Sequence, residues 1–190
     1  CGCDAQGVRH QVVDDLPSYL DPDGLAKYFP SDWIRGSEIL TAYLVSLSNE
    51  AGWELPESLR ARMLAGLKGF VEGRIVRISD LPTADLTVRK VAALEALSRY
   101  GEATWAMTGS LQLQPNLWPT SAVIDWREIL KRLKDAPVGG GVAGPVASLA
   151  LEARRKETDQ MLRSRLNFQG SMMGFSTESI DELWWMMVST

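Results

Sequence analysis

The feature that most constrains this chain is a succession of apolar stripes at helical spacing, each bounded by Pro, Gly or a hydroxyl residue. Apolar side chains recur three and four residues apart, which predicts amphipathic helices that each bury one face. We expect helices over residues 37–53, 56–71, 83–101, 105–113, 121–133 and 146–166, with a last one from about Ser176.

Local signals support the ends of these helices. Ser37 and Thr83 stand where a hydroxyl can cap a helix start, Pro56 suits a first turn, and Gly101 suits a helix end. No alternating run of β-branched residues persists, and residues 74–78 form the one weak strand candidate. The predicted fold class is therefore all-α.

Three helix openings resemble one another: a turn residue, then a hydroxyl residue, then an apolar run, at residues 36–39, 82–86 and 119–123. Their spacing is irregular, so they predict loosely repeated helical hairpins rather than a strict solenoid. Such pairs suit an α/α toroid or a superhelix. We expect a single domain over residues 1–190, and an incomplete toroid, because the chain starts without methionine and ends inside an apolar run.

Composition excludes several classes of protein. The net charge of −4 gives no reason to expect nucleic acid as a partner, and no apolar stretch is long enough to cross a membrane. Cys1, Cys3 and the single His10 cannot complete a four-ligand zinc site. We expect no metal and no cofactor.

Chemical reactivity is suggested by one short motif, Cys3-Asp4-Ala5-Gln6. A cysteine and a glutamine three residues apart lie on the same face of a helical turn. Their side chains can condense to an internal thioester with loss of ammonia. The product is an acyl donor that reacts once with an amine or a hydroxyl group.

Several other residue types were weighed as site candidates. Trp33, Trp53 and Trp118 lie near predicted helix ends and are candidates for the surface; Trp118, together with Asn116, is the favoured binding candidate. Trp126, Trp184 and Trp185 fall in apolar runs and are expected in the core. The neighbouring acidic pairs Asp14–Asp15 and Asp181–Glu182 point apart on a helix, so solvated charge is the better interpretation. His10 is read as an ordinary solvated side chain.

Several segments between about residue 16 and the end of the chain share a pattern with one known family: 16–21, 23–25, 28–30, 36–43, 49–53, 115–123, 166–170, 174–177 and 183–186. In these segments the chain resembles the thioester domain of bacterial alpha-2-macroglobulins. Two features depart from the family. Cys3-Asp4-Ala5-Gln6 lacks the glutamate that usually precedes the glutamine, and the interval from Gln6 to Leu16 is short.

The resemblance implies an α/α toroid inside a larger protein that traps proteases. It implies a broad-spectrum endopeptidase inhibitor, not an enzyme, whose exposed thioester at Cys3 and Gln6 captures a protease lysine in a single turnover. The implied partners are proteases, other domains of the same chain and a peptidoglycan-synthesising penicillin-binding protein. The implied location is the periplasm, with a parent protein that is lipid-anchored to the inner membrane and serves in host defence.

Two alternatives stay open from the residues themselves. One is a passive helical protein-binding module without covalent chemistry, which exposed and clustered aromatic residues would favour. The other is an α/α-toroid carbohydrate-active enzyme, which needs convergent carboxylates or a metal cluster in a cleft.

Overall fold

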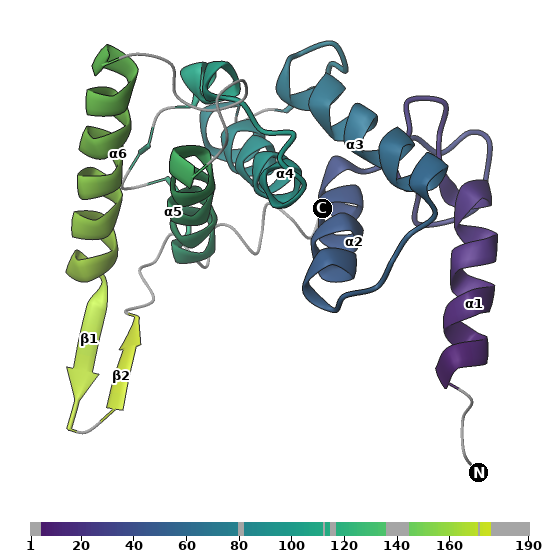
Figure 1. Ribbon diagram of the computed structural model, residues 1–190, viewed down its shortest axis with the longest axis horizontal. Coiled ribbons are helices and arrows are strands. Elements are labelled where there is room, and N and C mark those ends of the chain that lie inside the picture. Colours follow the sequence, from purple (N-terminus) through teal and green to yellow (C-terminus); the bar gives the residue numbers. More distant parts are fainter. Residues whose placement is uncertain are drawn as a thin grey trace. The chain divides into compact units, whose positions relative to one another are not determined.

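The computed structural model describes residues 5–79, 82–111, 113–114, 117–135, 145–170 and 172–175. It divides into two compact units, Cys1–Val76 and Arg77–Thr190. The described part is mostly helical, in agreement with the predicted class, and includes one small sheet (Figure 1). The single domain remains a prediction, because two units of paired helices can be parts of one helical array.

The first unit contains three α-helices: α1 (Ala5–Asp15), α2 (Glu38–Glu50) and α3 (Glu57–Val71). A 3-10 turn, Leu16–Tyr19, follows α1 directly. The predicted cap of α2 is confirmed, because the Ser37 hydroxyl accepts a hydrogen bond from Leu40 N at 3.2 Å. Pro56 immediately precedes α3, as predicted. The buried apolar side chains of this unit are Leu20, Leu25, Ala26, Ala42, Val45, Leu59, Met63, Leu67, Phe70 and Val71.

A buried carboxylate, Asp21, fixes the loop between the 3-10 turn and α2. Its Oδ1 accepts a hydrogen bond from Leu25 N and its Oδ2 one from Gly36 N, each at 2.8 Å. Ala26 N donates to the Thr41 hydroxyl on α2 at 2.7 Å. These bonds satisfy backbone groups that would otherwise be buried without partners, so the loop adopts one conformation.

The same loop packs closely against α3 at Gly24. Gly24 has a φ of +86°, and a Cβ built there would lie 2.3 Å from the carbonyl oxygen of Arg62. Both the positive φ and the close backbone approach require glycine. This contact ties the loop to α3, as the Asp21 bonds tie it to the start of α2.

The second unit contains α4 (Thr87–Arg99), α5 (Thr120–Asp135) and α6 (Pro145–Ser164). α5 packs against both α4 and α6 (Figure 1). A π-helical turn, Pro82–Leu86, leads into α4, and a 3-10 helix, Trp105–Ser110, lies between α4 and α5. Its fully buried large side chains include Leu94, Leu97, Leu111, Trp118, Trp126, Ile129 and Leu130.

Arg154 on α6 joins three segments of this unit. Its guanidinium carbon lies 4.9 Å from the ring centroid of Trp105 and 5.9 Å from that of Trp126. It also donates to the Thr108 carbonyl oxygen and hydroxyl at 3.2 and 3.1 Å. Cation–π contacts and hydrogen bonds together hold α6 against α5 and the 3-10 helix.

The prediction that the chain has no sheet is wrong for residues 166–175. Strands β1 (Leu166–Gln169) and β2 (Met172–Phe175) form an antiparallel hairpin, with Gly170 at a φ of +62° in the turn. The predicted helix 146–166 ends at Ser164 instead. Strands of four residues are too short for alternation to be distinguished from a helix end. The weak strand candidate, residues 74–78, forms no strand, and the last predicted helix lies outside the described residues.

Replacing Gly24 by alanine is predicted to destabilise the first unit by about 2–4 kcal/mol, because the loop and α3 must separate to admit the Cβ. Gly52→Ala is the matched control. Its φ of +65° is also left-handed, but no atom lies within 4 Å of the added Cβ, so a loss of about 1 kcal/mol is expected. Urea unfolding of the two variants measures the difference. Equal losses would contradict the close packing at Gly24.

Candidate functional site

The motif with chemical meaning leads into α1. Gln6 lies in the first turn of this helix, while Cys3 and the side chain of Gln6 lie outside the described residues. Counting along the helix from Gln6, residues 9, 10 and 13 occupy positions i+3, i+4 and i+7. Gln6, Arg9, His10 and Val13 therefore share one face of α1.

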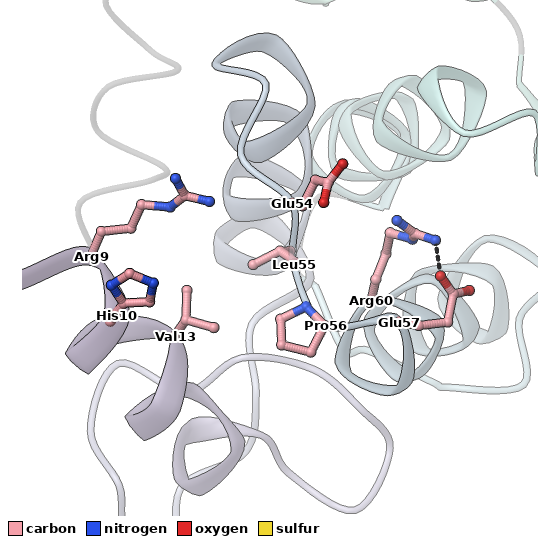
Figure 2. Close-up of a pocket in the computed structure, with 8 residues that line it drawn as sticks. All are labelled: Arg9, His10, Val13, Glu54, Leu55, Pro56, Glu57 and Arg60. Carbon is pink, nitrogen blue, oxygen red and sulfur yellow. Dashed lines mark hydrogen bonds and ion pairs between the residues drawn. The ribbon is translucent and has the colours of Figure 1, made fainter. Parts of the chain in front are cut away.

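This face of α1 borders a pocket in the first unit (Figure 2). The pocket has a volume of about 610 Å³. It is lined by three residues of α1, three of the α2–α3 connection and two of the first turn of α3: Arg9, His10, Val13, Glu54, Leu55, Pro56, Glu57 and Arg60. Three residues of the helix face on which Gln6 stands, Arg9, His10 and Val13, thus belong to the pocket lining.

The pocket carries charges of both signs. Arg9 and His10 lie on the α1 side, and Glu54 lies opposite them on the α2–α3 connection (Figure 2). Arg60 donates a hydrogen bond to the Glu57 carboxylate, so these two charges are paired with each other. Leu55, Pro56 and Val13 add apolar surface between them. A cavity with this lining suits the aliphatic stem and charged head of a side chain such as lysine.

The predicted surface role of Trp118 is wrong. Trp118 is fully buried, with 0% of its surface exposed, and its ring packs edge-on against Trp126 at 5.8 Å between centroids. The Trp118 carbonyl oxygen accepts a hydrogen bond of 2.7 Å from Arg165. Trp118, next to the start of α5, therefore belongs to the core of the second unit. Asn116 lies outside the described residues.

The other tryptophans follow their predicted environments where the structure describes them. Trp33 and Trp53 are exposed, at 85% and 48%, and Trp126 is buried at 1%. Trp184 and Trp185 lie outside the described residues. Tyr28 and Phe29, in the same loop as Trp33, are also more than half exposed. These aromatics give the first unit an apolar surface that sequence periodicity alone does not predict, because loops have no period.

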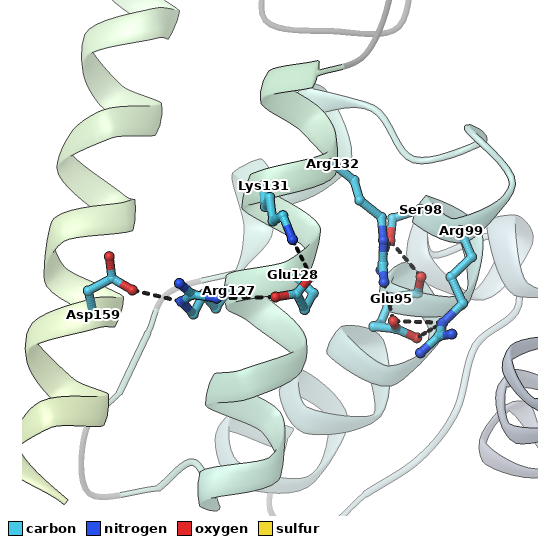
Figure 3. Close-up of polar contacts among 8 residues, drawn as sticks. All are labelled: Glu95, Ser98, Arg99, Arg127, Glu128, Lys131, Arg132 and Asp159. Carbon is cyan, nitrogen blue, oxygen red and sulfur yellow. Dashed lines mark hydrogen bonds and ion pairs between the residues drawn. The ribbon is translucent and has the colours of Figure 1, made fainter. Parts of the chain in front are cut away.

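A second group of charged residues, overlooked in the sequence, lies between α4 and α5 (Figure 3). Glu95 is only 5% exposed, and its carboxylate accepts bonds of 2.8 Å from both Arg99 Nε and Arg132 Nη1. Burial raises the pKa of Glu95, but the hydrogen bonds and charges of the two arginines outweigh it and lower the pKa overall. The sequence contained one signal for this group of charges. Glu95 stands inside the apolar run Ala93–Leu97, four residues before Arg99.

Asp125, on α5, is the neighbour of this group. Burial and the negative charge of Glu95 raise the pKa of Asp125 to about 6, against partial compensation by Arg99 and Arg132. Two carboxylates with pKa values shifted in opposite directions are typical of acid–base sites. Here, however, Glu95 is bound by two guanidinium groups, and that of Arg132 on α5 joins it to the neighbouring helix, so Glu95 serves the packing of α4 on α5. The acidic pair Asp14–Asp15 is exposed on α1, and Asp181–Glu182 lies outside the described residues.

Among the residues that the structure describes, no group of three or more His, Cys, Asp or Glu side chains is placed to hold a metal ion. None of the described helices combines the length and the apolar character that a membrane span requires. Comparisons with family models, curated proteins and solved structures give no match to this chain.

Asp125→Asn is predicted to raise the free energy of unfolding by about 1–2 kcal/mol at pH 7. Because the folded-state pKa is raised to about 6, the folded protein binds the proton more tightly than the unfolded chain. Asp125 therefore stabilises the fold below its unfolded pKa, and that contribution is lost as the pH rises through 6. The gain from asparagine should grow from about pH 4 to pH 6 and then stay constant.

Asp159→Asn is the control for this prediction. Asp159 forms an exposed ion pair with Arg127 at 2.8 Å, so its loss should cost less than about 1 kcal/mol and give no gain at pH 7. Chemical denaturation at several pH values measures both variants. A stability difference for Asp125→Asn that does not change between pH 4 and pH 7 would refute the assigned titration.

Proposed function

We propose that this chain is part of the thioester domain of a bacterial alpha-2-macroglobulin-like protein that traps proteases. The observation that carries the proposal is the place of Gln6: it occupies the first turn of α1, on the face that borders the pocket of Arg9, His10 and Glu54. Cys3 precedes it by three residues, the spacing that an internal thioester needs. The two helical units are proposed as parts of an α/α toroid.

Contacts between the segments that resemble the family support this assignment. Asp21, in the segment 16–21, binds Gly36 N, in the segment 36–43. Arg165, just before the segment 166–170, donates to the Trp118 carbonyl at 2.7 Å and to the Thr120 hydroxyl at 3.0 Å, both in the segment 115–123. Residues in or beside the segments that resemble the family thus form hydrogen bonds between distant parts of each unit. A substitution that breaks such a buried hydrogen bond lowers the free energy of unfolding.

The proposed reaction has two steps, formation of the thioester and its reaction with an amine. The Cys3 thiol displaces ammonia from the Gln6 side-chain amide and forms the thioester. A protease lysine then attacks the acyl carbon as a neutral amine, the C–S bond breaks, and an amide bond joins the lysine to residue 6. The sulfur leaves as a thiolate and takes up the proton that the amine loses. Each molecule reacts once, because the thioester is consumed.

The pocket supplies a way to receive the attacking amine. Glu54 attracts a lysine ammonium group, and the apolar side chains of Leu55, Pro56 and Val13 accept its aliphatic stem. Arg9 lies on the α1 side, next to the turn that carries Gln6, where its positive charge favours loss of a proton from an approaching ammonium group.

The biological setting proposed for the parent protein follows the resemblance. It is a periplasmic inhibitor, lipid-anchored to the inner membrane, that encloses proteases and uses its other domains to shield the thioester. A peptidoglycan-synthesising penicillin-binding protein is a further proposed partner. The second candidate function is a helical protein-binding module without covalent chemistry, which the exposed aromatics Tyr28, Phe29 and Trp33 favour.

The thioester is tested by the intact mass of the parent protein, expressed with its neighbouring domains, before and after methylamine treatment. We expect a starting mass short by one ammonia, then a gain of one methylamine with release of one thiol at Cys3. Cys3→Ser and Gln6→Ala should each show the full mass and no reaction. A wild-type mass that is complete and unchanged by methylamine would exclude the covalent mechanism and leave the binding module.

The role of the pocket is tested by the rate of that thiol release. Glu54→Gln should slow the reaction with methylamine about two- to threefold at low ionic strength, because the pocket then attracts the cation less, and high salt should reduce the difference. Glu72→Gln, at the far end of α3 and outside the pocket lining, should react at the wild-type rate. Equal rates for wild type and Glu54→Gln would show that the amine does not pass through the pocket.

A further inference from the structure

The pocket of the first unit presents charges of opposite sign on its two sides. Arg9 stands on the α1 side, and Glu54 stands on the α2–α3 connection across from it (Figure 2). In the part of the chain that the structure describes, neither of these side chains forms an ion pair, whereas Arg60 and Glu57 of the same lining are paired with each other. A ligand that carries both a cation and an anion therefore finds a partner for each in this pocket.

Apolar side chains complete the lining between these two charges. Val13 belongs to α1, Leu55 and Pro56 belong to the α2–α3 connection, and Leu55 points toward the α1 side (Figure 2). The methylene groups of a long side chain can pack on this surface while its charged end stays in contact with water. The lining thus accepts an aliphatic stem whose ammonium group lies at Glu54 while a carboxylate lies at Arg9.

The pocket is open at the surface of the unit. Its volume of about 610 Å³ falls within the range of about 300–1,000 Å³ that is usual for ligand sites. Five of its lining residues are exposed, so they do not enclose a ligand: Arg9, His10, Glu54, Pro56 and Glu57. A small molecule needs most of its surface buried to bind well. An open pocket therefore suits side chains that project from the surface of another protein.

Two other classes of ligand are disfavoured by the same lining. A nucleic acid or another polyanion would be repelled by the carboxylates of Glu54 and Glu57. A metal ion would lack ligands, because within the described residues no group of three or more His, Cys, Asp or Glu side chains is placed to hold one. The charges match a lysine and an acidic residue of one peptide segment.

We infer that the pocket binds a surface segment in which a lysine is followed two residues later by glutamate or aspartate. In an extended segment, side chains two residues apart point in the same direction, so both can enter one open pocket. Glu54 then pairs with the lysine ammonium group and Arg9 with the carboxylate. This inference rests on the proposed function in taking lysine as the ligand, and it adds Arg9 as the residue that selects among lysines.

The selection acts on affinity. When Arg9 holds a carboxylate, its positive charge is partly neutralised, so it then favours binding of the segment and no longer promotes loss of the amine proton. A lysine without an acidic neighbour binds through Glu54 and the apolar lining alone. The two kinds of lysine therefore differ in how tightly they bind, whether or not a covalent bond follows.

Binding of two peptides to the Cys3→Ser chain tests the inference without the covalent step. Acetyl-Lys-Ala-Glu-amide and acetyl-Lys-Ala-Gln-amide differ by one charge, and the NMR shifts of amides in residues 9–13 and 54–60 report their affinities. At low ionic strength the glutamate peptide should bind about two- to fivefold more tightly, and high salt should reduce this preference. Equal affinities, or no shift of these amides at millimolar peptide, would overturn the inference.

Substitutions of Arg9 test which residue reads the acidic neighbour. Arg9→Gln should abolish the preference and leave the affinity for the glutamine peptide near the wild-type value, since glutamine and arginine have similar helix propensities. Arg9→Glu should favour acetyl-Lys-Ala-Lys-amide over the glutamate peptide. Arg35→Gln is the matched control, because Arg35 is an exposed arginine of the same unit outside the pocket lining, and it should keep the wild-type preference. A preference that persists in Arg9→Gln would overturn the role of Arg9.

The peptide experiment and the methylamine experiment can fail independently. If methylamine reacts with the wild-type parent protein and the two peptides bind equally, the thioester trap stands and selection by Arg9 is wrong. If methylamine does not react and the glutamate peptide binds more tightly, the covalent mechanism is wrong and selection by Arg9 stands. The pocket is then the recognition site of a binding module.

Discussion

The carboxylate of Asp21 is withdrawn from water and accepts hydrogen bonds from two backbone N–H groups. One belongs to Leu25, four residues after Asp21 in the next turn, and the other to Gly36, fifteen residues after Asp21 on the approach to α2. Removing such a carboxylate would leave buried donors without acceptors, which costs more than the bonds themselves contribute. The neighbouring contact of Gly24 with Arg62 brings in α3. One short loop thereby contacts both the approach to α2 and α3, the helix whose first turn lines the pocket of the first unit.

In the second unit, segments that are distant in the sequence are joined by the guanidinium groups of arginines, whereas in the first unit the carboxylate of Asp21 has this role. Arg154 lies over two tryptophan rings, Arg165 binds the carbonyl oxygen of Trp118, and Arg132 bridges α5 to Glu95 on α4. Arginine suits these places because its planar, weakly hydrated head can stack on aromatic rings and donate several bonds at once. Glu95 is therefore a buried carboxylate that joins α4 to α5.

The sequence predicted much of the helical framework because periodicity and caps are local properties. Ser37 caps α2 as expected, and the stripes of α3, α4 and α5 match buried faces. The hairpin was not predicted because its two strands have only four residues each. So short a stretch shows too little alternation of apolar and polar residues to be told from the end of the preceding helix. Trp118 was misplaced because its burial depends on Trp126 and Arg165, and the latter is 47 residues away in sequence. The pocket could not be predicted either, because its lining combines residues that are far apart in the sequence. They come from α1, from the α2–α3 connection and from the start of α3.

The exposed face of the hairpin also matters while the chain is being made. Phe168 and Met173 are each 67% exposed, and the two strands make up the whole of their sheet, so each strand has an outer edge. An open strand edge that carries apolar side chains can pair with a strand of another molecule. Several copies of a chain are synthesised side by side on one messenger RNA, so nascent chains can associate through this hairpin before their synthesis ends.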